Sequence, residues 1–201
     1  MQEIEKFHEI RLSDQKKFDE IVYRKFSKNF FYDNNKNKLL RKNFLILKKT
    51  PKKFNIMHPL RVAFYSTLFF EKNIDLISLC IFHNLYEIEN INKDKFNKLI
   101  NKRILRYIEN LTIDKSLKFD RNYISNYYSK LLKFPKIVQI TKCLDKFDNL
   151  YNLKKNPDIK IKKKYLAEIK KYIVPLTKKN KIFNYYLNIL IKINYKHINN
   201  G

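Results

Sequence analysis

The sequence predicts an all-α protein with a single domain, and three observations support this prediction. One glycine and five prolines among 201 residues leave few of the tight turns that β-sandwiches and barrels need. Apolar residues recur every three or four positions along most of the chain, whereas the alternation typical of strands is weak everywhere. A hydrophobic content of 44% is enough to build one core in a chain of this length.

Polar segments and prolines divide this periodic pattern into separate helices. A polar break, YDNNKNK, covers 32–38, and TPKK at 50–53 ends the next helix. His58-Pro59 opens a helix, because proline suits the first helical turn, and Asn73 precedes a very apolar run that predicts a central buried helix. The expected helices cover 14–31, 39–47, a segment from 58 through about 68, 74–86, 93–110, 121–132, 135–153, 161–178 and 182–195.

The chain is strongly basic, with 44 Lys+Arg against 19 Asp+Glu and a formal net charge of +25. Such a charge favours polyanionic partners, which include nucleic acid and phosphorylated ligands. The lysines are spread from end to end, together with many Asn and Ile, which is typical of A+T-rich codon usage. We favour codon bias as the main cause of the charge, and any binding of nucleic acid is then expected to be non-specific.

The remaining composition excludes several classes of protein. The only glycine is the last residue, Gly201, so no glycine-rich phosphate loop or dinucleotide fingerprint is present. Cys80 and Cys143 lie in apolar runs, which suits buried, reduced thiols. The first residues lack the apolar core of a signal peptide, and no apolar run is long enough to cross a bilayer. We therefore expect a cytoplasmic protein without a membrane partner.

Four histidines are the first candidates for chemistry. His8 and His197 lie in the polar ends of the chain and are expected to be solvated. His58 and His83 lie in the two most apolar segments, where a histidine is usually a hydrogen-bonded core residue and less often a ligand. Two such helices beside a third that carries acidic groups make a shared site more plausible than either histidine alone.

The third helix, 135–153, carries Asp145, Asp148 and Asn149 at i, i+3 and i+4, so these side chains share one face. Asp145 follows an apolar turn and starts near the buried side, where a carboxylate needs a partner such as a metal ion. For Asp148, an ion pair with a lysine is the simpler interpretation. His83 and Glu87 are also four residues apart and are expected on one helix face, although Glu87 also fits an exposed acid near a helix end.

Four segments together resemble the HD superfamily of metal-dependent phosphohydrolases, and most closely its (p)ppGpp hydrolase domain. They are HPLRVA at 58–63, LISLCIFHNLYE at 76–87, TKCLDKFDNLYNL at 141–153 and YLAEIKKYIVPLTKK at 165–179. The resemblance covers about 35–180 and implies a single HD-domain-like helical bundle. It implies an N-terminal helical extension over 1–34, the HD-like domain over 35–180, and a C-terminal helix and tail over 181–201 packed on that domain.

The same resemblance implies roles for individual residues. The implied ligands of a divalent metal, usually Mn²⁺, are His58, His83, Asn84 and Asp145. Glu87 matches the acid that assists the attacking water, and Asn149 matches an asparagine that contacts the nucleotide. Lys49 stands where the family has an arginine that packs on the base, but the flanking segment lacks the family's R-x-x-G-x-P-Y pattern.

Two departures from the family pattern concern the metal and the catalytic acids. Asn84 replaces the aspartate of the HD pair, which weakens the site, and Ile88 replaces the second acid beside Glu87. The first hypothesis is therefore a hydrolase of a nucleotide or guanosine polyphosphate. The second is a degenerate HD protein that binds a nucleotide or phosphorylated ligand without turnover. The third is a basic helical nucleic-acid-binding module, with its 14 tyrosines available for stacking.

Overall fold

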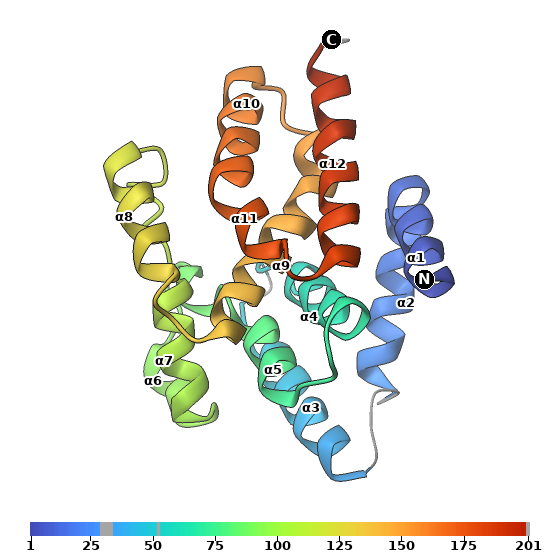
Figure 1. Cartoon of the computed structure of the whole chain (residues 1–201). Helices are drawn as coiled ribbons and strands as arrows, with labels where there is room; N and C mark the ends of the chain where they lie inside the picture. Colours follow the sequence, from blue (N-terminus) through green and yellow to red (C-terminus); the bar gives the residue numbers. More distant parts are fainter. Residues whose placement is uncertain (29–33, 52, 200–201) are drawn as a thin grey trace.

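Helices account for all the regular structure in residues 1–28, 34–51 and 53–199, the part of the chain that the computed structural model describes. The predicted all-α class is therefore confirmed (Figure 1). The helices are α1 (Gln2–Ser13), α2 (Gln15–Ser27), α3 (Asn34–Leu47), α4 (Met57–Phe69), α5 (Ile74–Phe82), α6 (Lys93–Asn97), α7 (Lys102–Leu111), α8 (Arg121–Leu131), α9 (Lys136–Leu153), α10 (Ile159–Glu168), α11 (Val174–Thr177) and α12 (Lys181–Asn199). A 3₁₀ turn follows α5 at Leu85–Glu87, and a π-helical turn at Ile169–Ile173 joins α10 to α11.

Asparagine and aspartate side chains start many of these helices. Each accepts a hydrogen bond from a backbone N–H of the first turn, which satisfies a donor that the helix itself leaves free. The capping residues are Asp14, Asn73, Asn92, Asn101, Asp120 and Asp158. Among the described residues, a non-glycine residue with positive φ occurs at Asn90 (φ 57°), which suits asparagine best after glycine. Asparagine thus takes over turn positions in a chain almost without glycine.

Three expected boundaries were wrong. Residues 34–38 of the polar break belong to α3, since Lys favours a helix and Asn disfavours it only weakly, and since Leu40, Phe44 and Leu47 of the same helix are buried. The helix expected over 93–110 is divided, because the side chain of Asn101 caps a new helix. The helix expected over 74–86 ends at Phe82. The remaining parts of the first helix and of the polar break, at 29–33, lie outside the described residues.

The centre of the molecule is formed by α4, α5 and α9, which pack against one another. Phe64, Leu79 and Leu144 are completely buried there. In Figure 1, α1 and α2 lie on one side of this centre and α6 to α8 lie on the other, while α12 packs along α9. No helix in the described part of the chain is both long and apolar enough to cross a membrane. The central packing brings the first turn of α4, the end of α5 and the middle of α9 to one place.

Candidate metal centre

His58, His83 and Asp145 form a compact cluster at this place. Their donor atoms all lie within 4.8 Å of one another. His58 Nε2 is 3.1 Å from His83 Nε2 and 3.2 Å from Asp145 Oδ1, and His83 Nε2 is 3.6 Å from the same oxygen. The structure therefore brings together three of the four residues expected as metal ligands, from three different helical segments.

Both imidazoles are oriented by hydrogen bonds from their other nitrogen. His58 Nδ1 lies 2.8 Å from Asp148 Oδ2, and His83 Nδ1 lies 2.8 Å from the carbonyl oxygen of Cys80. A carboxylate and a carbonyl only accept, so each Nδ1 carries the proton and donates it. Each Nε2 is then left as an acceptor that faces the other Nε2 and a carboxylate oxygen. Three acceptors at such distances repel one another unless a proton or a cation lies among them.

In the absence of a metal, a proton takes this place. Burial alone would lower the pKa of His58, but hydrogen bonds to Asp145 and Asp148 outweigh burial and raise its pKa to about 9. Burial would likewise raise the pKa of Asp145, but the ammonium group of Lys142 and the two histidines hold that pKa well below its usual value. The cluster is thus built to hold positive charge. Nitrogen and carboxylate donors of this kind suit divalent transition metals, whose binding would displace the proton.

Asn84 supports the same interpretation. Its Oδ1 is buried and has no hydrogen-bond partner, which is costly for a polar atom in a protein interior. Asn84 lines the same cavity as the three clustered residues. A buried oxygen without a donor, in the lining of the cavity that two imidazoles and a carboxylate share, is chemically suited to face a divalent ion. The residues present therefore fit a metal that His58, His83 and Asp145 would hold, with Asn84 as a neutral neighbour.

The cluster opens into a cavity of about 550 Å³. Four lysines line it, against the two acids Glu87 and Asp145; they are Lys115, Lys118, Lys142 and Lys146. A neighbouring cavity of about 450 Å³ shares Asn84, Glu87 and Lys115 with the first and also contains the partly buried ring of Phe54. The two cavities adjoin and form one cleft, large enough for a phosphorylated small molecule. Lysines outnumber acids in its lining as a whole, although Lys142 and Lys146 are ion-paired with Asp145 and Glu168.

The other expected site residues are arranged as follows. Glu87 lines both cavities from the 3₁₀ turn, and its Oε1 accepts a weak hydrogen bond (3.4 Å) from the backbone N–H of Ile113. Because α5 ends at Phe82, the expectation that His83 and Glu87 share a face of one helix was wrong. Asn149 lines the cleft and donates to Asp145 Oδ1 at 2.8 Å. Lys49 is exposed and lines neither cavity.

Two simpler expectations also need correction. Asp148 is fully buried and pairs with Arg61 and Arg11, not with a lysine, because arginine matches a carboxylate with two parallel donors. His8 is only partly exposed, since its ring packs against Tyr151 and Tyr186, and burial lowers its pKa to about 4. His197 is exposed, as expected.

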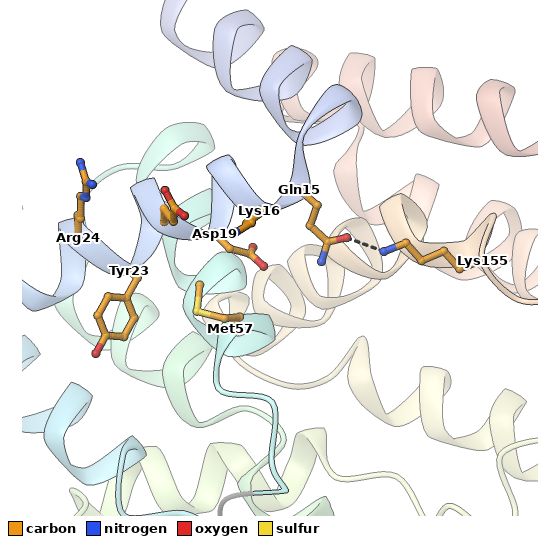
Figure 2. A pocket seen from close by; sticks show the side chains of 8 residues that line it. Gln15, Lys16, Asp19, Tyr23, Arg24, Met57 and Lys155 are labelled. Carbon is orange, nitrogen blue, oxygen red and sulfur yellow. Dashed lines mark hydrogen bonds between the residues drawn. The ribbon is translucent and has the colours of Figure 1, made fainter.

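A further cavity, of about 590 Å³, lies along α2 and is open to solvent (Figure 2). Figure 2 shows Asp19, Tyr23 and Met57 at its wall, with Gln15 bonded to Lys155. Both acidic and basic side chains line it, and none of the clustered ligands does. This mixture of charges indicates no particular ligand. The cavity nevertheless leaves the side chain of Asp19 in contact with solvent.

Comparisons with known proteins bear on the fold. No protein-family profile matches the sequence, and no curated protein matches it. A solved structure described as a metazoan ortholog of SpoT that hydrolyses ppGpp has the same fold, with a TM-score of 0.64. The similarity covers 80% of this chain and 96% of that chain, at 17% sequence identity. At this level of identity the likeness shows a shared all-helical fold, and a shared fold does not establish a shared chemistry.

Sequence reasoning missed the charged residues behind the cluster. Arg61 and Lys142 are both almost completely buried, and both touch an aspartate of α9. For Arg61 a signal was available, because it interrupts a largely apolar segment three residues after His58, whereas Lys142 lies among polar neighbours such as Asp145 and Lys146 and gave none. In a chain with 44 basic residues this signal was hidden among many surface lysines.

Proposed function

We propose that this protein is a divalent-metal-dependent phosphohydrolase that acts on a nucleotide, with a guanosine polyphosphate as the first substrate to test. The observation that carries the proposal is the convergence of His58, His83 and Asp145, whose donor atoms lie within 4.8 Å of one another. The metal is proposed as Mn²⁺, the ion that the family resemblance implies, while the mixed imidazole and carboxylate donors suit divalent transition metals in general.

A metal ion in such a site lowers the pKa of a bound water and polarises a phosphate oxygen. Side chains of the protein are available to accept a proton and to bind the substrate. Glu87 lies in the wall of the same cavity and is the acid available to accept a proton from the attacking water. Lys115, Lys118 and Lys146 line the cleft and offer charge to substrate phosphates, and Asn149 is the amide available to a sugar or base.

The choice of substrate rests on the cleft and on the neighbour. The cleft is basic and exceeds the size of a single phosphate group. The structurally similar metazoan protein is described as hydrolysing ppGpp. A guanosine polyphosphate fits the cleft in charge and in size, because it carries several phosphates and an aromatic base. Lys49, which the family resemblance assigns to that base, is exposed and lies outside the lining of the cleft, so the geometry gives this contact no support.

The test measures release of phosphate or pyrophosphate from guanosine tetraphosphate and from a simple phosphate ester, with added Mn²⁺. His58→Asn and His83→Asn are expected to abolish release and to remove bound metal, as determined by elemental analysis. His197→Asn, which changes an exposed histidine, is the matched control and is expected to behave as the wild type. Activity that survives both cluster variants would reject the proposed site.

The second candidate is a protein that binds a nucleotide or phosphorylated ligand without turnover. Asn84 and Ile88 favour it, because they replace an acidic ligand and an acidic neighbour of Glu87. The same experiment separates the two candidates. Saturable binding of guanosine tetraphosphate, measured by calorimetry with no product formed over hours, would support the binding protein.

A further inference from the structure

Asp148 is the most deeply buried acid of the site, with a side chain that is completely inaccessible to solvent. It does not line the cleft, so it cannot touch a ligand there. It lies instead behind His58 and accepts the Nδ1 proton of that ring at 2.8 Å. A buried carboxylate without compensating donors would be very unfavourable.

Arg61 supplies most of the compensating donors. Its Nε lies 2.9 Å from Asp148 Oδ1, and one terminal nitrogen lies 2.9 Å from Asp148 Oδ2. Two parallel hydrogen bonds of this kind fix both the position and the plane of the carboxylate. Asp148 therefore presents Oδ2 to His58 in one orientation. Since that contact needs the proton on Nδ1, it leaves Nε2 free to face the cluster.

The N-terminal helices hold this pair from behind. Asp19 on α2 accepts from another terminal nitrogen of Arg61 at 3.1 Å. Arg11 on α1 is buried and approaches Asp148 Oδ1 at 3.5 Å. Asp19 also lines the open cavity of Figure 2, with its side chain 22% exposed. A continuous chain of charged contacts thus runs from solvent at α2 to the imidazole of His58.

We propose that Asp148 is a positioning residue for the metal ligand His58, and that Arg61, supported by Arg11 and Asp19, holds Asp148 in the orientation that this role requires. The N-terminal helices α1 and α2 then support the metal centre indirectly, because Arg11 and Asp19 contact Asp148 and Arg61 and do not contact the metal ligands themselves. His83 provides an internal comparison, because its Nδ1 is held by a backbone carbonyl and does not depend on this network. The inference rests on the proposed metal centre.

The first experiment measures the affinity for Mn²⁺ and Zn²⁺ by calorimetry in the full chain. Asp148→Asn and Arg61→Met are expected to weaken binding by roughly 10- to 100-fold, the usual effect of removing a partner of a ligating histidine. In Asp148→Asn, an amide nitrogen has to face either Arg61 or His58, so one of the two contacts is lost. Arg11→Met and Asp19→Asn are expected to have smaller effects, because they act through Asp148 and Arg61.

Matched controls come from an ion pair elsewhere. Arg103 and Asp75 form a solvent-exposed arginine–aspartate pair. Arg103→Met and Asp75→Asn make the same chemical changes away from the cluster and are expected to leave metal affinity unchanged. Thermal unfolding of each metal-free variant identifies any that fails to fold, and Arg61→Lys, which keeps the charge but not the two-point contact, then replaces Arg61→Met.

The second experiment distinguishes positioning from general destabilisation. In the Zn²⁺-loaded protein, nuclear magnetic resonance of labelled histidine rings is expected to show a protected Nδ1 proton on both His58 and His83. Asp148→Asn is expected to shift the His58 signal or expose it to exchange, and to leave the His83 signal in place. A merely structural role would move both signals or neither.

Each outcome decides the inference. Metal binding that Asp148→Asn leaves unchanged would overturn it while leaving the proposed hydrolase intact. Wild-type protein that binds metal tightly, with Asp148-dependent affinity but without turnover, would support the inference and reject the hydrolase. Wild-type protein that binds no divalent ion would overturn both.

Discussion

Lys142 Nζ lies 3.3 Å from Asp145 Oδ2 in the interior of the protein, so the proposed metal ligand is already paired with a cation. Burial would lower the pKa of Lys142, but its acidic neighbours, the phenol of Tyr127 and the carboxylates of Asp145 and Glu87, outweigh burial and raise it. The ammonium group therefore stays charged. A metal ion that binds Asp145 has to do so beside a fixed positive charge.

Replacing Lys142 by methionine is expected to tighten the binding of divalent metal about 10-fold or more, since two nearby charges repel by several kcal/mol at an effective dielectric constant of about 20. The same change is expected to raise the KM for a phosphorylated substrate, because the cleft loses one cation. Calorimetry and steady-state kinetics measure the two effects. Lys136→Met, on an exposed position of α9, is the control. Weaker metal binding in Lys142→Met would show that Lys142 mainly holds Asp145 in place.

Restoring the acidic ligand with Asn84→Asp is expected to raise metal affinity by about 10-fold or more, because a carboxylate adds a full charge close to the ion. It is not expected to restore full turnover, since Ile88 still replaces the second acid beside Glu87. The double variant Asn84→Asp with Ile88→Asp is expected to hydrolyse guanosine tetraphosphate faster than either single variant. Phosphate release and elemental analysis are the measurements.

Asn152→Asp is the matched control for this series, because it adds the same charge to the lining of the same cavity. Two results would contradict the prediction. If the control raises metal affinity as much as Asn84→Asp, the effect comes from the general charge of the cleft. If the wild type turns over substrate at ordinary enzyme rates, the amide of Asn84 already suffices.

His8 is expected to make the fold sensitive to mild acid. Burial lowers its pKa to about 4 from an ordinary value of 6.5, so the folded protein favours the neutral ring. Its contribution to stability is complete above pH 6.5 and is lost as the pH falls from 6.5 toward 4. His8→Phe keeps an aromatic ring without the titrating group. It should therefore lose about 1–2 kcal/mol less than the wild type between pH 7 and pH 4.5, because partial exposure of the ring reduces the full effect of the pKa shift.

Urea unfolding at the two pH values measures this difference. His197→Phe, which changes an exposed histidine, is expected to follow the wild type. An equal loss in the wild type and His8→Phe would mean that the buried ring accepts a proton without cost.

Binding to nucleic acid is expected to be weak and to decrease steeply with salt. The basic residues are spread over the whole sequence, so the attraction is to the phosphate backbone in general. Fluorescence anisotropy with single- and double-stranded probes at about 50 and 200 mM salt is expected to show a loss of affinity of at least 10-fold and no preference for sequence. Tight binding that survives at the higher salt would favour a nucleic-acid-binding module.

The sequence predicted the parts of the structure that depend on local pattern. The periodicity of α9 gave its start and end within one residue, and the apolar context of the two histidines agrees with a buried His83 and a partly buried His58. It could not predict that α5 ends before His83, because Phe82 and Leu85 are equally apolar on both sides of the break. The pairing of Asp148 with Arg61 was also hidden, since the two residues are 87 positions apart and only packing brings them together.

The early end of α5 has an electrostatic consequence. The peptide dipoles of a helix add up to about half a negative charge at its C-terminal end. The last turn of α5 contains the carbonyl group of Cys80 that bonds to His83, so this negative end lies beside the cluster. Had the helix continued to Tyr86, that charge would lie a full turn beyond the histidine. Because Asn84 carries a neutral amide, the site has less negative potential than a carboxylate at this position would provide. The C-terminal end of the shortened helix α5 supplies part of that negative potential.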